Sequence, residues 1–281
     1  MSPIPAGAAA NAIALDLRGI TCTFPPPASG GEPYTAVREA SIGLGQGDFV
    51  AIVGPTGCGK STLLNVAAGL LAAQSGEVRV FGAPLRGINQ HAGYMFQAEA
   101  LLPWLTARGN VALGLELHGM SRKEAQARAD DWLARVGLAG FGERYPKQLS
   151  GGMKKRVALA QVLALEPKIL LMDEPFSALD VQTRQLMENE LLEMWSADRK
   201  SVFFVTHDLE EAISLADRVI VLSSGPATRP VADFTVDIPR PRDVTEIVQS
   251  PHYLDLHRRI WDILKKEVLK SYERGKTLAA G

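Results

Sequence analysis

The chain has 281 residues, of which 46% are apolar and 22% charged, and its formal net charge is -1 at pH 7. This composition allows a buried core, and the near-zero charge excludes a general attraction to nucleic acid or to an anionic lipid surface. Two cysteines are too few for a disulfide scaffold, no apolar run approaches the ~18 residues of a membrane span, and the alanine-rich start lacks the basic flank of a signal peptide. We therefore expect a globular protein of a reducing cytoplasm, which reaches a membrane only through a partner protein.

The N-terminal quarter of the chain has a β-like pattern. Residues 1–11 are rich in Pro, Ala and Gly without a period, and we expect a disordered tail there. Ile13–Leu17 alternates, Ile20–Phe24 is β-prone, and the turn-rich stretch 25–32 follows. Val78–Phe81 is a further candidate strand. These segments predict an N-terminal antiparallel β subdomain.

A glycine-rich stretch, Gly54–Ser61, joins the apolar run Phe49–Val53 to a helical segment, Thr62–Ala73. It fits the pattern G-x-x-x-x-G-K-[ST], in which backbone N–H groups freed by glycine wrap the α- and β-phosphates of a nucleotide. In that pattern Lys60 reaches the β- and γ-phosphates, the hydroxyl of Ser61 ligates Mg²⁺, and the helix N-terminus adds its positive dipole end. We predict a nucleotide-binding site formed by Gly54, Pro55, Thr56, Gly57, Cys58, Gly59, Lys60, Ser61 and Thr62.

Cys58 lies inside this loop and beside the helix N-terminus, a position that favours the thiolate. We expect a cysteine that a maleimide alkylates and that bound ATP protects.

The middle of the chain is helical. Ala92–Gln97 predicts a short strand, and a helical pattern then extends as far as Leu165. Within it, Ser121–Glu124 is a capping-box start, and Gly137 ends the helix that begins there.

Leu149–Met153 is a second helix start made of small residues, and its helix extends toward Pro167. The chain's own phosphate site has no room for this second helix start. The start either binds an anion from elsewhere or is a plain cap by Ser150, and the residues alone leave both open.

Three apolar runs in the second half are continuous rather than alternating, which is typical of buried parallel strands. Between them we expect two helices, the second with Asp208 and Glu211 as a capping box. The runs are Ile169–Met172, Val202–Val205 and Val219–Leu222, and the helices are Val181–Trp195 and Leu209–Ala216.

Asp173 and Glu174 follow the first of these runs, at the carboxyl edge of the expected sheet, where ligands gather. Asp173 is placed to hold Mg²⁺ through water, and Glu174 to polarise the water that attacks a phosphate. An acidic pair after a strand is more often a turn or a helix cap, but beside a phosphate loop the functional interpretation prevails.

These motifs and several others stand in the order and spacing of the ATP-binding cassette of ABC transporters, and the chain resembles that family from about Leu15 to Leu222. The resemblance implies an ATPase with an α/β fold, a RecA-like P-loop NTPase core with a mainly parallel sheet. It also implies that two cassettes meet head to tail, with ATP between the phosphate loop of one and the Ser150–Gly152 turn of the other. The motifs are Gly54–Ser61, Gln97, Leu149–Met153, Leu170–Glu174, Ser177–Asp180 and His207.

The resemblance implies roles for residues that their surroundings alone do not assign. Gln97 resembles the glutamine that senses Mg²⁺ and water and links to the transporter. Asp180 resembles the aspartate that crosses the dimer, and His207 the switch histidine at the γ-phosphate. Without the resemblance, Gln97 is an interior amide and His207 a structural histidine. Phe24 is similar to the aromatic residue that stacks on adenine, with Tyr34 as the alternative and a plain core role for Phe24 as a third interpretation.

The implied site therefore divides by role. Glu174, His207, Lys60 and Gln97 act in catalysis, and Ser61, Gln97 and Asp173 hold the metal. In the second cassette, Ser150, Gly151, Gly152 and Asp180 contact the same nucleotide. Met153 stands where the family usually has glutamine, so the contact there rests on Ser150 and the backbone.

Within that family the chain more closely resembles importer cassettes of the nitrate, sulfonate and taurine type, through Leu149–Lys154, Phe96–Trp104 and Ile238–Asp243, which are less specific than the ATP motifs. This implies membrane permease subunits, a periplasmic or lipoprotein substrate-binding protein, and a peripheral place on the cytoplasmic face of the inner membrane. A chromosome or DNA-repair ATPase of this class would need a long heptad insertion within 62–148, which is absent. One copy of each motif argues against a two-cassette translation factor, and Glu174 with His207 argues against a non-hydrolysing regulatory module.

We expect three parts: a disordered tail over 1–11, an ATP-binding cassette over 12–240 with a helical signature subdomain at 98–165, and a C-terminal helical extension over 241–281. Within the extension, Val244–Val268 predicts one or two amphipathic helices that pack on their own domain or serve regulation or dimer contact.

The segment Ala98–Leu105 is richer in large apolar residues than an ordinary surface loop. Either it packs inside the helical subdomain or, as the resemblance implies, the groove beside it receives a short helix of the membrane subunit.

Overall fold

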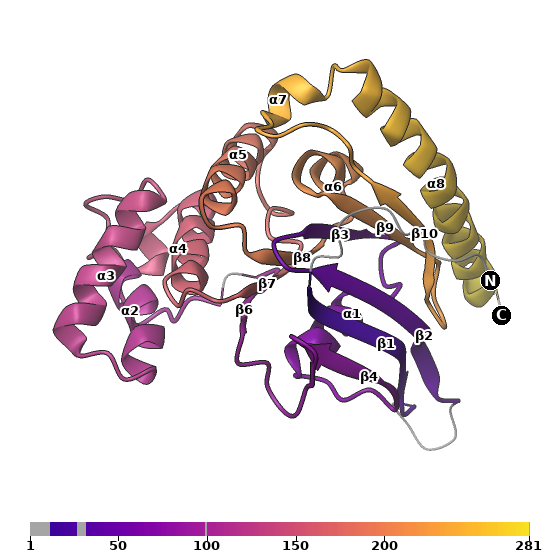
Figure 1. Ribbon diagram of the computed structural model, residues 1–281, viewed down its shortest axis with the longest axis horizontal. Helices are drawn as coiled ribbons and strands as arrows, with labels where there is room; N and C mark the ends of the chain where they lie inside the picture. Colours follow the sequence, from indigo (N-terminus) through magenta and orange to yellow (C-terminus); the bar gives the residue numbers. More distant parts are fainter. Residues whose placement is uncertain (1–11, 27–31, 99, 281) are drawn as a thin grey trace.

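The computed structural model describes residues 12–26, 32–98 and 100–280 (Figure 1). The tail expected over 1–11 lies outside these residues. Two sheets stand beside each other, and three helices form a separate lobe. None of the helices in the described part of the chain is both long and apolar enough to cross a bilayer.

The first sheet is antiparallel, as the sequence predicts, with the strand order β2-β1-β4-β5. The two β-prone stretches expected near the start form one strand, because Gly19 takes φ +58° and lets the strand continue through an irregularity in its pairing. The strands are β1 (Ile13–Phe24), β2 (Tyr34–Gly45), β4 (Ser75–Val80) and β5 (Ala83–Pro84).

The second sheet has the order β10-β9-β3-β8-β7-β6, and all its pairs are parallel except β9 with β10. Because parallel strands end at the same edge, the residues that follow β3, β7 and β8 meet there. The strands are β3 (Phe49–Val53), β6 (Ala92–Met95), β7 (Ile169–Asp173), β8 (Ser201–Val205), β9 (Arg218–Leu222) and β10 (Pro230–Thr235).

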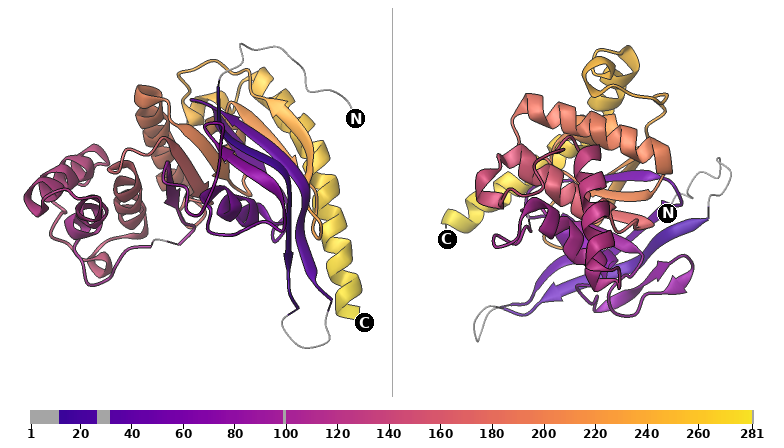
Figure 2. Two further views of the ribbon diagram at one scale, coloured as in Figure 1. Left: turned by 60° about the horizontal axis from the view of Figure 1, so that its bottom comes forward. Right: turned by 90° about the vertical axis from the view of Figure 1, so that its left-hand side faces the viewer.

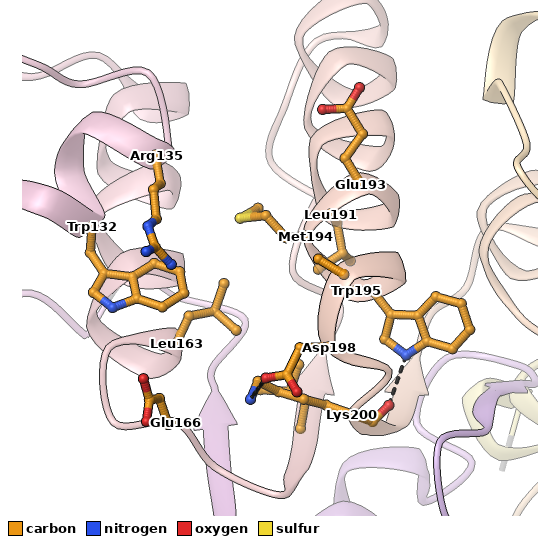
Figure 3. Close-up of a pocket in the computed structure, with 12 residues that line it drawn as sticks. Trp132, Arg135, Leu163, Glu166, Leu191, Glu193, Met194, Trp195, Asp198 and Lys200 are labelled. Atoms are coloured by element: carbon orange, nitrogen blue, oxygen red, sulfur yellow. Dashed lines mark hydrogen bonds and ion pairs between the residues drawn. The ribbon is translucent and has the colours of Figure 1, made fainter.

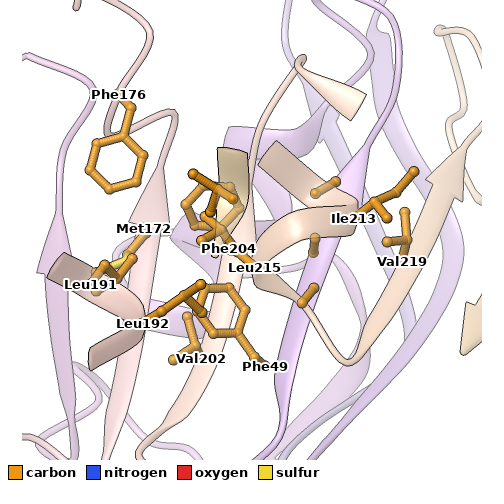
Figure 4. Packing of buried hydrophobic residues seen from close by; sticks show 14 of the residues in the cluster. Phe49, Met172, Phe176, Leu191, Leu192, Val202, Phe204, Ile213, Leu215 and Val219 are labelled. Carbon is orange, nitrogen blue, oxygen red and sulfur yellow. The ribbon is translucent and has the colours of Figure 1, made fainter. Parts of the chain in front are cut away.

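Both faces of this second sheet are covered. Alternate residues of β3 enter two different cores: Phe49 and Ala51 belong to the one that Figure 4 shows, and Val50 and Ile52 to the other. The first core is closed by α5 (Val181–Asp198), α6 (Leu209–Leu215) and the C-terminal helix, and the second by α1 (Lys60–Ala68) and the antiparallel sheet. This burial on both sides explains why the strands read as continuous apolar runs.

The helical lobe consists of α2 (Ala107–Leu117), α3 (Arg122–Arg135) and α4 (Gly151–Leu163), with the short 3₁₀ turn η1 (Pro146–Gln148), and it has its own small core. It projects from the side of the sheets, as Figure 1 and the left-hand view of Figure 2 show. The capping box at Ser121 is present, and Gly137 follows the end of α3 with φ +71°.

The second expected capping box is wrong in one respect. Asp208 caps α6, but the Glu211 carboxylate accepts a hydrogen bond from the Thr206 hydroxyl at 2.5 Å instead of reaching back to the cap.

The chain ends in α7 (Val244–Ile247) and α8 (Pro251–Ala280). Leu256, Ile260 and Leu264 are buried in the core below α6, so the extension packs on its own domain. The helix is longer than the pattern predicted, because it continues beyond Val268 without its apolar face being covered.

Candidate functional site

The phosphate loop joins β3 to α1 at the carboxyl edge of the parallel sheet. Gly57 and Gly59 both have positive φ, +74° and +109°, which residues with a side chain rarely adopt. A Cβ on Gly59 would also lie 3.2 Å from Val37 Cγ2 and 3.3 Å from the Ala36 carbonyl oxygen. The loop therefore turns tightly, and its backbone N–H groups come together above the start of α1.

Lys60 begins α1 and is only 5% exposed. Its ammonium donates to the carbonyl oxygens of Gly54 and Pro55, at 3.0 and 3.3 Å, and lies 3.8 Å from Glu174 Oε1. The charge is thus held across the mouth of the loop, where the phosphates of a nucleotide would meet it.

Asp173 and Ser61 meet at the bottom of the site. The Ser61 hydroxyl donates to Asp173 Oδ1 at 3.0 Å, and burial raises the pKa of the Asp173 carboxyl while this hydrogen bond lowers it. Mg²⁺ prefers one or two protein oxygens together with substrate phosphates and water. A hydroxyl and a carboxylate beside a phosphate loop fit that demand, and the part of the chain that the structure describes has no group of three His, Cys, Asp or Glu side chains able to hold a metal.

Glu174 occupies the centre of the site. Its backbone has φ +43°, an uncommon value for a residue other than glycine, and its N–H donates to the Val205 carbonyl at 2.8 Å. Its side chain is turned into the cavity, where Oε2 accepts a hydrogen bond from Gln97 Nε2 at 3.2 Å and lies 2.9 Å from His207 Nδ1. This uncommon backbone conformation turns the carboxylate toward Gln97 and His207.

Gln97 and His207 reach Glu174 from two different strand ends. Gln97 follows β6, and its backbone carbonyl accepts a hydrogen bond from the Lys155 ammonium, which α4 of the helical lobe carries. His207 follows β8 and is half exposed. Sequence reasoning assigned both residues through the family resemblance alone, and the structure brings both to the carboxylate.

A cavity of ≈ 450 Å³ opens above these groups. Phe24 and Tyr34, at the ends of the paired strands β1 and β2, both line it, together with the phosphate loop, Gln97, Glu174 and His207. The core role for Phe24 is therefore wrong, since the ring is 37% exposed at the cavity rim. Either aromatic ring has the position to stack on a base.

The structure does not bring the Ser150–Gly152 turn or Asp180 into this cavity. Ser150 caps α4 and accepts a hydrogen bond from the Met153 N–H at 3.2 Å. Asp180 caps α5 and accepts from the Thr183 N–H at 3.0 Å, which lowers the pKa of its carboxyl. Ser150 and Asp180 are both exposed, and within one chain each serves as the N-cap of its helix.

Two supporting residues, Lys155 and Tyr94, were missed by the sequence reasoning. Lys155, 1% exposed, connects the helical lobe to Gln97. The Tyr94 hydroxyl donates to Asn65 Oδ1 at 3.0 Å, and burial raises the pKa of Tyr94. Nothing in the sequence next to this lysine or this tyrosine indicates its role, because each one contacts a residue that is distant in the sequence.

The expectation for Cys58 is wrong. The thiol is only 1% exposed, and burial raises its pKa although the nearby Lys60 charge lowers it. The helix terminus favours a thiolate only where water or a ligand reaches the sulfur. Cys58 instead packs in the core below the antiparallel sheet.

A second cavity, of ≈ 390 Å³, lies between the helical lobe and α5 (Figure 3). Trp132 and Leu163 face Met194 across it, and Asp198 and Lys200 lie at its rim. Asp198 and Lys200 precede β8, so this cavity is at the amino edge of the sheet, away from the phosphate loop. None of the residues that line this second cavity lines the nucleotide cavity.

Comparison with known proteins places the chain among nucleotide-binding subunits. The model of the ABC transporter family matches residues 37–177. The chain is 46% identical over 229 residues to an ATP-binding protein of Brucella abortus, which covers 81% of this chain and 87% of that protein. It is 39% identical over 244 residues to the nitrate import ATP-binding protein NrtD of Synechococcus elongatus, covering 86% of this chain and 88% of that protein. A solved dimeric ATP-binding cassette in a post-hydrolysis state, bound to ADP and Pi, superposes with a TM-score of 0.71 at 32% identity, covering 80% of this chain and 100% of that chain.

Proposed function

We propose that this chain, which belongs to the ABC transporter family of ATP-binding cassettes, is the ATPase subunit of a bacterial importer that takes up a small anion through separate permease subunits. The observation that carries the proposal is the position of the Glu174 carboxylate. It stands at the mouth of the phosphate loop, 3.8 Å from the Lys60 ammonium and within hydrogen-bond distance of Gln97 and His207.

The residues of the site divide the work of hydrolysis. The loop N–H groups and Lys60 hold the β- and γ-phosphates, which fixes the reacting phosphorus atom. Glu174 accepts a proton from the attacking water, and His207 stabilises the γ-phosphate as its bond to the β-phosphate breaks. Ser61, Asp173 and Gln97 would hold Mg²⁺, which would neutralise negative charge on the phosphates.

The second cassette completes the site. Ser150, Gly151 and Gly152 form an exposed helix start in the helical lobe, which offers N–H donors to an anion outside the chain's own cavity. A Cβ on Gly152 would lie 2.9 Å from Thr183 Cγ2, so a larger residue here would require a shift where this turn meets the start of α5. A head-to-tail dimer would place this turn over the γ-phosphate of the partner's nucleotide and Asp180 across the interface.

The permease would dock beside the segment that follows Gln97. Leu101 packs against the cores, whereas Trp104 is 69% exposed, so the segment is anchored at one point and open at another. Of its eight residues, Glu99 lies outside the described part of the chain. Lys155 holds the Gln97 carbonyl, so movement of Gln97 on nucleotide binding would be felt by this segment and by the helical lobe.

Nitrate-like, sulfonate-like or taurine-like anions are the proposed cargo, because a relative at 39% identity is named for nitrate import. A periplasmic or lipoprotein substrate-binding protein would deliver the anion, and the cassette would be peripheral on the cytoplasmic face of the inner membrane. The cassette itself is proposed to span 12–240, with its helical subdomain at 98–165, and the extension to span 241–281.

Reconstitution tests this proposal. The chain is purified together with its permease subunits and its substrate-binding protein, and the complex is incorporated into liposomes that hold Mg-ATP on the cassette side. The proposal predicts ATP-dependent uptake of labelled nitrate, taurine or an alkylsulfonate. ATP hydrolysis without movement of any of these anions would leave the ATPase assignment standing and refute the cargo class.

A further inference from the structure

The exposed face of α8 adjoins the phosphate loop. A groove of ≈ 690 Å³ lies between the two, with Thr56 and His207 on one side and Trp261, Val268 and Tyr272 on the other. Thr56 and His207 also line the nucleotide cavity, so the groove and that cavity share a wall. Leu264, buried at 5% exposure, forms the floor.

The helix is held in this position by two polar contacts. The Glu267 carboxylate accepts a hydrogen bond from the Ser224 N–H at 2.9 Å, and the Arg274 guanidinium donates to the Gly225 carbonyl. The Ser224–Gly225 turn in turn packs on the phosphate loop, since a Cβ on Gly225 would lie 3.6 Å from Cys58 Cα. The turn at Ser224 and Gly225 therefore connects α8 to the phosphate loop.

The face of α8 that lines the groove carries large apolar side chains that are not buried in the core. Trp261, Val268 and Tyr272 lie on the same face of α8 as Leu264, at helical spacing, yet they are 44%, 41% and 62% exposed. An apolar helix face beside a nucleotide site is costly to leave in water and typical of a contact surface.

We propose that this groove is an accessory contact between two copies of the chain, which closes when ATP brings the cassettes together. The proposal rests on the head-to-tail dimer described above. The occupant is a second copy because the groove is continuous with the phosphate-loop face, onto which the partner's Ser150–Gly152 turn would close. Trp261, Val268 and Tyr272 then add apolar area to an interface otherwise made by nucleotide and polar turns.

The test uses the full chain with Glu174→Gln, which would hold ATP without turnover, and sedimentation velocity in Mg-ATP over a range of protein concentrations. Val268→Glu is compared with Leu269→Glu on this background. Leu269 is the next residue on the helix and is similarly exposed, at 49%, but it does not line the groove. We expect Val268→Glu to weaken the ATP-dependent dimer about tenfold or more, and Leu269→Glu to change it less than about threefold.

Hydroxyl-radical footprinting of the Glu174→Gln chain, without either α8 substitution, gives a second readout. Trp261 and Tyr272 should lose reactivity in Mg-ATP in parallel with dimer formation, while exposed Trp104 serves as the internal control and keeps its reactivity. Protection that does not depend on protein concentration would mean closure within one chain and would overturn the proposal.

The remaining outcomes separate this inference from the proposed function. If the Glu174→Gln chain stays monomeric in Mg-ATP at every concentration, the head-to-tail dimer fails and the groove contact fails with it. If that chain dimerises but Val268→Glu and Leu269→Glu behave alike, and Trp261 stays reactive, the dimer stands and the groove contact is refuted.

Discussion

Replacing Lys60 with alanine removes the one lysine among the residues that line the nucleotide cavity. Lys60 is 5% exposed, and its ammonium donates to two loop carbonyls and lies 3.8 Å from Glu174 Oε1. In Lys60→Ala the glycines still allow the loop to fold, but Asp173 and Glu174 lose the positive charge that compensates them. Both the lost attraction and the remaining negative charge should weaken the binding of a polyphosphate.

The magnitude follows from the type of contact. A hydrogen bond to a charged group contributes about 1.5–3 kcal/mol, which corresponds to a factor of about 10 to 150 in affinity. Burial places the contact toward the upper part of that range, since the lysine is not screened by water.

The assay is calorimetry with the non-hydrolysable β,γ-imido analogue of ATP and Mg²⁺, so that turnover does not disturb the titration. Lys123→Ala, an exposed lysine on α3, is the matched control and should bind as the unchanged chain does. Thermal melting of each variant shows whether the fold is intact. If Lys60→Ala binds the analogue within about threefold of the unchanged chain, the phosphate-loop geometry described here is not the nucleotide site.

Three further changes test separate parts of the site. Ser61→Ala removes the hydroxyl bonded to Asp173 and should raise the Mg²⁺ needed for half-maximal ATP hydrolysis about tenfold or more; an unchanged Mg²⁺ titration would exclude Ser61 as a ligand. Burial, with the nearby Glu211 charge, raises the pKa of Glu188 to about 8, so the folded chain holds a proton that the unfolded chain releases above about pH 4.5, and stability falls as pH rises between these values. Glu188→Gln should therefore stabilise the chain by on the order of 2 kcal/mol at pH 9 and far less at pH 4.5, which melting at both pH values checks; an equal change at both would refute the buried charge. Trp104→Glu should reduce co-purification with the permease while leaving the melting temperature within a few degrees of the unchanged chain, and lost melting stability with normal assembly would show that the indole packs in the core.

The signals in the sequence that predict the central site are local. The phosphate loop needs glycine at fixed spacing before a lysine, and Asp173 and Glu174 follow a continuous apolar run; both features carry their chemistry within a few residues. The family membership, the α/β cassette fold and the ATPase activity, all predicted from the ordered motifs, are confirmed.

What the sequence does not predict depends on distant parts of the chain. The pKa of Cys58 is set by burial under the antiparallel sheet rather than by the adjacent helix start, so the local argument had the wrong sign. Lys155 reads as one of three basic residues on a helix, and only the folded lobe places it on the Gln97 carbonyl. The length of α8 and the groove beside it also needed the structure, because a periodic apolar face does not say whether anything covers it.

The residue roles at the nucleotide site remain predictions. The position of Glu174 between Lys60, Gln97 and His207 supports its role, but the placement of Ser150 and Asp180 at a nucleotide depends on a second copy.

Glu174→Gln in the purified chain tests the central claim most directly. The change keeps the size of the side chain and its hydrogen bonding but removes the charge that accepts a proton from water, with exposed Glu193→Gln as the matched control. Hydrolysis and ATP affinity are measured on the same preparations. We predict that turnover falls by about 10²–10⁴ while ATP still binds with near-native affinity, and that the control keeps full turnover. Turnover within about threefold of the unchanged chain would contradict the assignment of Glu174 as the residue that activates water.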